Sequence, residues 1–218
     1  MCFSAEASFI AGSLLSLGGL SGIVRVVRKK ALRLLPYALI PMIFALHQFT
    51  EGGLWIALKA HHQEWVETLS WIFVLIAYCL WPLLVPISIT IMEPQKIRKK
   101  ILIGFSVVGV IASLSFLYSI LSYDKPISGY IHHRNIEYTF RYSPIYLLNM
   151  LYGASVNLSG LASSFRSVQA FAAGLTGSYV IAYQIWRRTY ESVWCYFGAV
   201  LSMIVLIHIW NASKEKTA

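Results

Sequence analysis

A glutamate stands inside an apolar segment of the sequence that is long enough to span a bilayer. The segment runs from Leu35 to Ala60, and Glu51 has His47 one helical turn before it and Trp55 one turn after it. Residues four apart lie on the same face of an α-helix, so imidazole, carboxylate and indole form one polar stripe. An ionisable group at membrane depth costs about 2.5–3.5 kcal/mol on insertion scales and usually faces a protein interior or a wet cavity. The stripe is therefore the first candidate site.

Three interpretations of this stripe stay open. Glu51 and His47 can share a proton and form a relay, because histidine titrates near neutral pH. The same two side chains can ligate a metal together with partners from other helices. The third interpretation is structural: a buried polar pair that only fixes helix packing, although burying a carboxylate for packing alone is unfavourable.

The cysteines suggest a second set of candidates. Cys2 precedes the first apolar segment and Cys195 opens the last, while Cys79 lies in the middle of a segment. In an oxidising compartment Cys2 and Cys195 can form a disulfide. Ligation of a soft transition metal together with His132 is the second interpretation, and inert packing is the third. There is no zinc-type cysteine spacing, so the cofactor remains unknown, with a transition metal as the candidate.

Two further apolar segments carry polar side chains at helical spacing. Asn149 begins a row of amide and small residues at four-residue steps, which suits either close helix packing or a cavity wall. Tyr179 and Tyr183 lie one turn apart and give their helix a polar edge whose outer end can meet Glu51. The predicted proton- or substrate-binding residues are Glu51, His47, Trp55, Tyr183 and Asn149.

The composition indicates an integral membrane protein. The chain has 218 residues, of which 57% are hydrophobic and only 12% are charged, whereas soluble domains have about 25% charged residues. The net charge of +9 is concentrated in two loops, 25–33 and 96–100, that directly adjoin apolar segments. We expect these loops to orient the chain and to contact anionic lipids of the bilayer, and we expect no nucleic-acid partner.

The fold predicted from this pattern is all-α: a polytopic membrane helix bundle that forms one domain over residues 1–218. Each expected transmembrane segment is close to the about 20 residues needed to cross a bilayer. The seven segments are 7–24, 35–58, 68–92, 101–122, 144–165, 168–186 and 192–211. Six spans are the main alternative, because the sixth segment is the shortest and the fifth the least hydrophobic. Twelve Lys and Arg on one side against six on the other predict an outer N-terminus and a cytoplasmic C-terminus.

Two local patterns bear on the shape of the site. In the outer loop 123–143, alternation of apolar and polar residues predicts a short β-hairpin that turns near Arg134-Asn135. Prolines interrupt the second and third segments, and prolines often bend helices that line a cavity. We therefore expect the second and third helices and the outer hairpin to form the walls of the site.

Three strings carry a family resemblance: MCFSAEASF at the N-terminus, HQFTEGGLWIAL around Glu51, and SVWCYFGAVLSMIVL in the last segment. With them the chain resembles a family of uncharacterised bacterial multi-spanning membrane proteins that open with an MCFSA-x-ASF motif. The resemblance implies a membrane location, with the bacterial inner (cytoplasmic) membrane expected, and emphasises Cys2, Glu51, Trp55 and Cys195. The family's form of the second string does not require His47, which weakens the relay. No activity is implied.

The leading functional hypothesis is a small transporter or ligand-binding protein whose Glu51 is a protonatable or cation-binding group open to the outer side. It predicts a cavity between the second, third, sixth and seventh helices. The first alternative is a membrane-embedded, metal-dependent hydrolase or redox enzyme. The second is an accessory subunit whose polar stripe pairs with a partner helix. The small ligand, the oligomeric state and whether the protein is an enzyme stay open.

Overall fold

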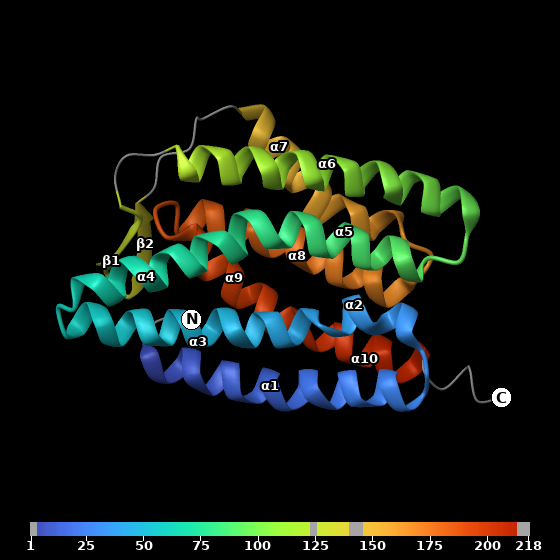
Figure 1. Ribbon diagram of the computed structural model, residues 1–218, viewed down its shortest axis with the longest axis horizontal. Helices are drawn as coiled ribbons and strands as arrows, with labels where there is room; N and C mark the ends of the chain where they lie inside the picture. Colours follow the sequence, from blue (N-terminus) through green and yellow to red (C-terminus); the bar gives the residue numbers. More distant parts are fainter. Residues whose placement is uncertain (1–3, 123–125, 140–145, 213–218) are drawn as a thin grey trace.

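The computed structural model describes residues 4–122, 126–139 and 146–212, and in these residues the helices run side by side as seven rods (Figure 1). Each predicted apolar segment falls on one rod. The rods are α1 (Ala5–Arg28); η1 (Leu32–Leu34), α2 (Leu35–Ala38) and α3 (Ile40–Lys59); α4 (Gln63–Val74), η2 (Leu75–Leu80) and α5 (Trp81–Met92); α6 (Lys96–Leu121); α7 (Tyr146–Gly153), η3 (Ala154–Leu158) and η4 (Ser159–Ala162); α8 (Arg166–Ile185); and α9 (Tyr190–Leu201) with α10 (Met203–Ala212).

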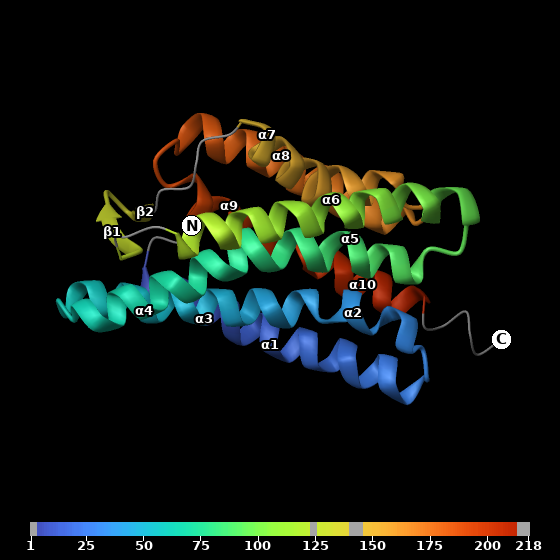
Figure 2. The ribbon, with the colours of Figure 1, turned by 45° about the horizontal axis from the view of Figure 1, so that its top comes forward.

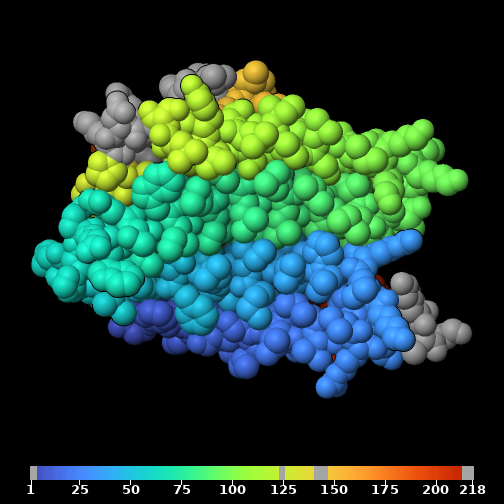
Figure 3. Space-filling model, in the orientation of Figure 1, coloured from blue at the N-terminus to red at the C-terminus, as the bar shows by residue number. Residues whose placement is uncertain are grey.

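Five rods in the described residues are long and apolar enough to cross a membrane: Ala5–Arg28, Leu32–Lys59, Gln63–Met92, Lys96–Leu121 and Tyr190–Ala212. In Figure 3, α1 and α6 border opposite sides of the face shown. Both helices expose large apolar side chains, such as Leu17 on α1 and Leu114 on α6. Such surfaces suit lipid contact, so the fold fits an integral membrane protein. The count of seven spans and the orientation stay predictions.

The two ends of the bundle differ in charge. The connection after α1 and the start of α6, which carry the basic loops 25–33 and 96–100, lie at one end (Figures 1 and 2). The hairpin, the turn between α3 and α4 and the connection between α8 and α9 lie at the other. We refer to these as the basic end and the hairpin end.

The predicted hairpin is present at this second end. Strands β1 (Ser128–His132) and β2 (Asn135–Thr139) pair antiparallel, with Tyr130 opposite Glu137. The turn includes His133, whose φ of 53° lies in the left-handed region. Ile136 is fully buried, and the ring of Tyr138 stacks on Phe73 of α4 at 4.0 Å. The hairpin that the alternation predicted is therefore present, and the buried side chains of β2 attach it to the bundle.

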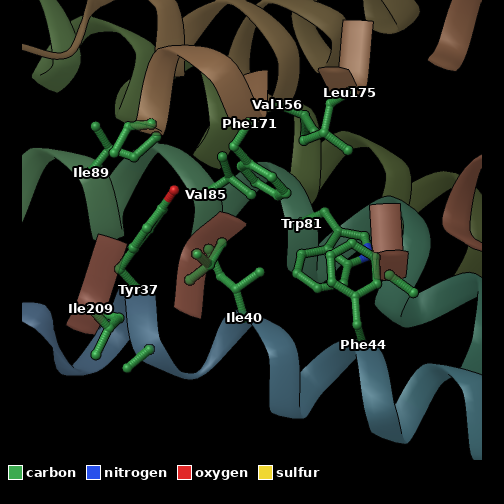
Figure 4. Close-up of a cluster of buried hydrophobic side chains, with 14 of the residues drawn as sticks. Tyr37, Ile40, Phe44, Trp81, Val85, Ile89, Val156, Phe171, Leu175 and Ile209 are labelled. Carbon is green, nitrogen blue, oxygen red and sulfur yellow. The ribbon is translucent and has the colours of Figure 1, made fainter. Parts of the chain in front are cut away.

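One cluster of buried apolar side chains lies between the rods (Figure 4). In it the rings of Phe44 of α3 and Trp81 of α5 stack, with their centroids 4.1 Å apart. Around them gather buried side chains from α2, α3, α5, η3, α8 and α10: Tyr37, Ile40, Val85, Ile89, Val156, Phe171, Leu175 and Ile209. These side chains come from five of the seven rods, and their packing positions the polar side chains described below.

A proline and a glycine set the distance between α5 and α6. Pro86 has no N–H to donate to the carbonyl of Pro82 one turn earlier. On α6, Gly109 lies against this carbonyl so closely that a Cβ added to it would meet the Pro82 oxygen at 1.9 Å. Gly104 on the same helix has nothing within 4 Å of its added Cβ. Close backbone contact at Gly109 therefore requires the absence of a side chain.

We expect Gly109→Ala to lower the thermal unfolding temperature of the purified protein in detergent, because α6 must move away from α5. Small-to-large changes in a packed interior cost about 1–3 kcal/mol. Gly104→Ala is the matched control, and it should be neutral or slightly stabilising because alanine favours helix by about 1 kcal/mol over glycine. Equal unfolding temperatures for the two variants would contradict the close contact.

Glu93 joins two connections at the basic end. Its carboxylate accepts hydrogen bonds from the backbone N–H of Ser164 at 2.9 Å, the Ser164 hydroxyl at 2.7 Å, the Ser163 hydroxyl at 3.1 Å and the backbone N–H of Gln95 at 3.1 Å. Burial raises the pKa of Glu93, but these hydrogen bonds to the charged form outweigh it and hold the pKa below its ordinary value of 4.5.

The lowered pKa of Glu93 predicts a pH-dependent stability. Its contribution is fully present above the unfolded value of 4.5 and is lost as the pH falls through the lower folded value. Glu93→Gln should lower the unfolding temperature at neutral pH and reduce its fall upon acidification. The exposed Glu64→Gln is the control and should keep the wild-type pH profile. An unchanged profile in Glu93→Gln would show that other groups carry the acid sensitivity.

Candidate functional site

A cavity of about 90 Å³ lies between the third, fifth, sixth and seventh rods. One water molecule needs about 10–15 Å³ of such volume, so the cavity has room for a small molecule or several waters. We call it the Glu191 cavity. It is lined by Ala77, Tyr78, Asn149, Tyr152, Gly153, Asn157, Tyr179, Tyr190, Glu191, Trp194 and Cys195.

Glu191 supplies the carboxylate of this cavity. It lies in the first turn of α9, where free backbone N–H groups and the helix dipole favour an acid. The hydroxyl of Tyr78 donates to Glu191 Oε1 at 3.1 Å and lies 3.3 Å from the Tyr190 hydroxyl. An acid in the first turn of a helix is common. Here the hydroxyl of Tyr78, from the third rod, also holds the carboxylate at the cavity wall.

Five aromatic rings form a closed circuit around the cavity. The centroid of Tyr78 lies 5.9 Å from that of Tyr152, and Tyr152 lies 6.0 Å from Trp194. Trp194 is 5.1 Å from Tyr179, and Tyr179 is 6.1 Å from Tyr190, which contacts Tyr78 through its hydroxyl. Three of these pairs are T-shaped or edge contacts, a favourable geometry for aromatic quadrupoles.

Two π-helical segments shape the wall. Ala77 and Tyr78 belong to η2, and Asn157 belongs to η3. Pro82 explains the first, because it has no N–H for the carbonyl four residues earlier, at Tyr78. The carbonyl of Ala77 accepts a hydrogen bond from the Tyr152 hydroxyl at 2.8 Å. Single π-helical turns inside α-helices occur frequently at functional sites.

The row of small and amide residues on the fifth rod lines the cavity. Asn149, Gly153 and Asn157 are all in its wall, and that they bind a ligand stays a prediction. Nothing lies within 4 Å of a Cβ added at Gly153, which leaves this part of the wall open. Asn157 is buried, and its Oδ1 has no hydrogen-bond partner among the described residues. A buried acceptor of this kind is suited to a ligand or water donor.

Glu51 is fully buried, and the prediction that it is open to the outer side is wrong. α3 packs against α9, and the carboxylate of Glu51 accepts a hydrogen bond from the hydroxyl of Ser192 within this contact. Glu51 is not among the residues that line the Glu191 cavity. The expected walls are also corrected: the fifth rod takes the place of the second, and no described residue of the hairpin lines this cavity.

The rest of the polar stripe faces other neighbours. His47 is fully buried, its Nε2 lies 3.2 Å from the carbonyl oxygen of Phe73, and its ring lies 4.1 Å from the Phe73 ring. Trp55 is also buried, and its Nε1 has no hydrogen-bond partner among the described residues. Because His47 bonds α4 while Glu51 bonds α9, the contacts do not support a relay between them.

Tyr183 lies beside the cavity rather than in its wall. It is partly exposed, and its ring centroid is 5.9 Å from that of Tyr179 and 5.5 Å from that of Tyr190. The guanidinium of Arg187 lies over its ring at 5.6 Å. Tyr183 thus supports two residues of the aromatic circuit from outside.

The predicted thiol and metal groups are separated. Cys195 is buried in the cavity wall and forms no disulfide with another described cysteine, whereas Cys2 lies outside the described residues, so their pairing stays a prediction. His132 lies on the hairpin, with its Nδ1 3.7 Å from a carboxylate oxygen of Glu137. In the described part of the chain, no three His, Cys, Asp or Glu side chains come together as metal ligands.

The sequence-based prediction included Asn149 and Cys195 but missed Glu191. The seventh segment was expected to begin at residue 192, which placed Glu191 in a loop. Its spacing to Cys195, one helical turn later, was the available signal. No local pattern links Tyr78, Tyr152 and Trp194, which come together only when the rods pack.

Fold and cavity together define a class: an all-helical bundle with apolar helices of membrane length around an acidic cavity walled by aromatic rings. The chain belongs to a family of unknown function (DUF6629), whose model matches residues 1–218. This confirms the resemblance to an uncharacterised family that the sequence motifs predicted. No curated protein and no solved structure matches the chain.

Proposed function

We propose that this is an integral membrane protein that binds a small organic cation, an amine or a quaternary ammonium ion, in the Glu191 cavity. Binding at this position is the recognition step of a small ligand-binding or transport protein. One observation carries the proposal: a carboxylate lines the same cavity as five aromatic residues that contact one another in a closed series.

The chemistry of the walls favours a cation. Aromatic rings attract a cation that lies within about 6 Å of their centroids, and the attraction reaches about 2 kcal/mol or more in a desolvated site. A cation leaving water also needs a partner of opposite charge, which Glu191 supplies. The Asn157 oxygen adds an acceptor for an N–H group. The volume of about 90 Å³ restricts the ligand to a few heavy atoms.

Glu51 has a positioning role in this proposal. Its partner Ser192 directly follows Glu191 in the first turns of α9. The bond between Glu51 and Ser192 therefore fixes the start of α9, and with it the direction of the Glu191 side chain. The basic loops 25–33 and 96–100 remain the proposed contacts with anionic lipid.

Calorimetric titration of the purified protein in detergent tests the proposal. Methylammonium and tetramethylammonium should bind saturably, and tetramethylammonium should compete with methylammonium. The uncharged tert-butanol, of similar shape to tetramethylammonium, should show no saturable binding, because it lacks the charge that the carboxylate and rings recognise. Failure of both ammonium ions to bind, or equal binding of tert-butanol, would refute a cation site.

A further inference from the structure

A second pocket lies at the hairpin end, between the turn of the hairpin and the connection from α8 to α9. Both segments lie close together in Figures 1 and 2, and together they enclose a volume of about 550 Å³. We call it the arginine pocket. Its lining residues are His132, His133, Arg134, Asn135, Ile185, Trp186, Arg187, Arg188 and Thr189.

The charged side chains that line this pocket, among the described residues, are all cationic. Arg134, Arg187 and Arg188 line it, and among the residues that the structure describes no Asp or Glu lines it. These three are half of the six Lys and Arg residues in the predicted outer loops. The predicted outer side has fewer Lys and Arg residues than the inner side, and half of them line this one pocket. Like charges that converge in this way raise the local concentration of anions.

The backbone around the arginines is held in place. Asn135 and Thr189 are buried, and the N–H of Thr189 donates to the carbonyl of Trp186 at 2.9 Å. The guanidinium of Arg187 lies over the ring of Tyr183 at 5.6 Å. The nearest acid on the hairpin is Glu137, which faces His132 at 3.7 Å. The cations are thus supported by fixed segments on both sides of the pocket.

We propose that the arginine pocket binds a phosphate group. The planar guanidinium presents N–H donors in a fork that matches phosphate oxygens, and two or three such forks in one concavity select a multiply charged oxyanion. The phosphate belongs either to a soluble phosphate compound or to the headgroup of an anionic lipid. This site is separate from the Glu191 cavity and does not depend on the function proposed for it.

Titration of the detergent-purified protein with inorganic phosphate, at constant ionic strength set by chloride, tests the soluble source. The Arg134→Gln and Arg187→Gln variants should each lose about tenfold or more in phosphate affinity, because each removes one charge-assisted pair. Lys59→Gln is the matched control, since Lys59 ends α3 at the same end but does not line the pocket. Its affinity should stay within about twofold of wild type, because an exposed charge outside the pocket acts only through a screened field.

Nanodiscs distinguish the lipid source. Wild-type protein reconstituted in mixed phosphatidylglycerol and phosphatidylcholine should retain phosphatidylglycerol in native mass spectra, and Arg187→Gln should retain less. Retention that depends on Arg187 without binding of inorganic phosphate assigns the pocket to a lipid headgroup. If neither phosphate nor phosphatidylglycerol depends on Arg134 or Arg187, or if Lys59→Gln is equally impaired, the proposal fails. Thermal unfolding of each variant verifies that it is folded.

Discussion

The Glu191→Gln variant is expected to bind tetramethylammonium about 30-fold or more weakly than the wild-type protein, since removing one partner of a desolvated charge pair costs about 2–5 kcal/mol. Glutamine has nearly the same shape as glutamate, and its amide oxygen can still accept from the Tyr78 hydroxyl, so the cavity keeps its walls. The loss of affinity would therefore result from the missing charge and not from a change in the fold. Calorimetric titration measures the affinity, and thermal unfolding verifies the fold.

A second substitution in the same cavity distinguishes the contribution of the aromatic rings to cation binding from that of the carboxylate. Tyr179 contacts both Trp194 and Tyr190 in the aromatic circuit. Tyr179→Phe keeps the ring and should bind the cation nearly as well as the wild type, whereas Tyr179→Leu should lose about 0.5–2 kcal/mol of binding free energy with the ring. Equal affinity in the leucine variant would indicate that the carboxylate alone attracts the ligand.

The rods and the hairpin were predictable because their signals are local. Apolar runs of membrane length mark the helices, and alternation along 128–139 marks the strands. The helices run beyond several predicted segments, for example to Gln63 and Lys96, because a helix continues into polar residues outside the apolar run. Prolines correctly indicated interrupted helices, but not that one interruption would be a π-helical turn at Tyr78.

The site was only partly predictable, because a cavity depends on how rods pack. Helical spacing alone placed Asn149 on a polar face, and the cavity then included it. The same spacing put Glu51 on a polar face, but the packing of α3 against α9 turned that face into a closed contact. Which of two acids borders a cavity is decided by contacts between segments about a hundred or more residues apart, such as Tyr78 with Glu191, at a sequence separation of 113. Sequence periodicity does not contain that information.

Glu51→Leu is expected to destabilise the protein strongly. The change removes the carboxylate that accepts the hydrogen bond from the buried Ser192 hydroxyl, and losing a hydrogen bond to a charged group costs about 1.5–3 kcal/mol. It also places a branched apolar side chain in a contact shaped for a carboxylate. Glu51→Gln keeps an oxygen that can accept from Ser192 and should unfold closer to the wild-type temperature. Unfolding in detergent, followed by near-UV circular dichroism, measures both effects.

A double-mutant cycle with Ser192→Ala tests whether Glu51 acts through this bond. If it does, Glu51→Leu and Ser192→Ala are strongly non-additive, because each removes the same hydrogen bond. Ser192→Ala should also weaken cation binding in the Glu191 cavity modestly, as the start of α9 is less well fixed. A different result would show that Glu51 itself binds the ligand. In that case Glu51→Gln abolishes cation binding, while the unfolding temperatures of Glu51→Gln and Ser192→Ala stay at the wild-type value. Because Glu51 bonds Ser192 while the neighbouring Glu191 bonds Tyr78, the comparison of Glu51→Gln with Glu191→Gln decides which carboxylate meets the cation.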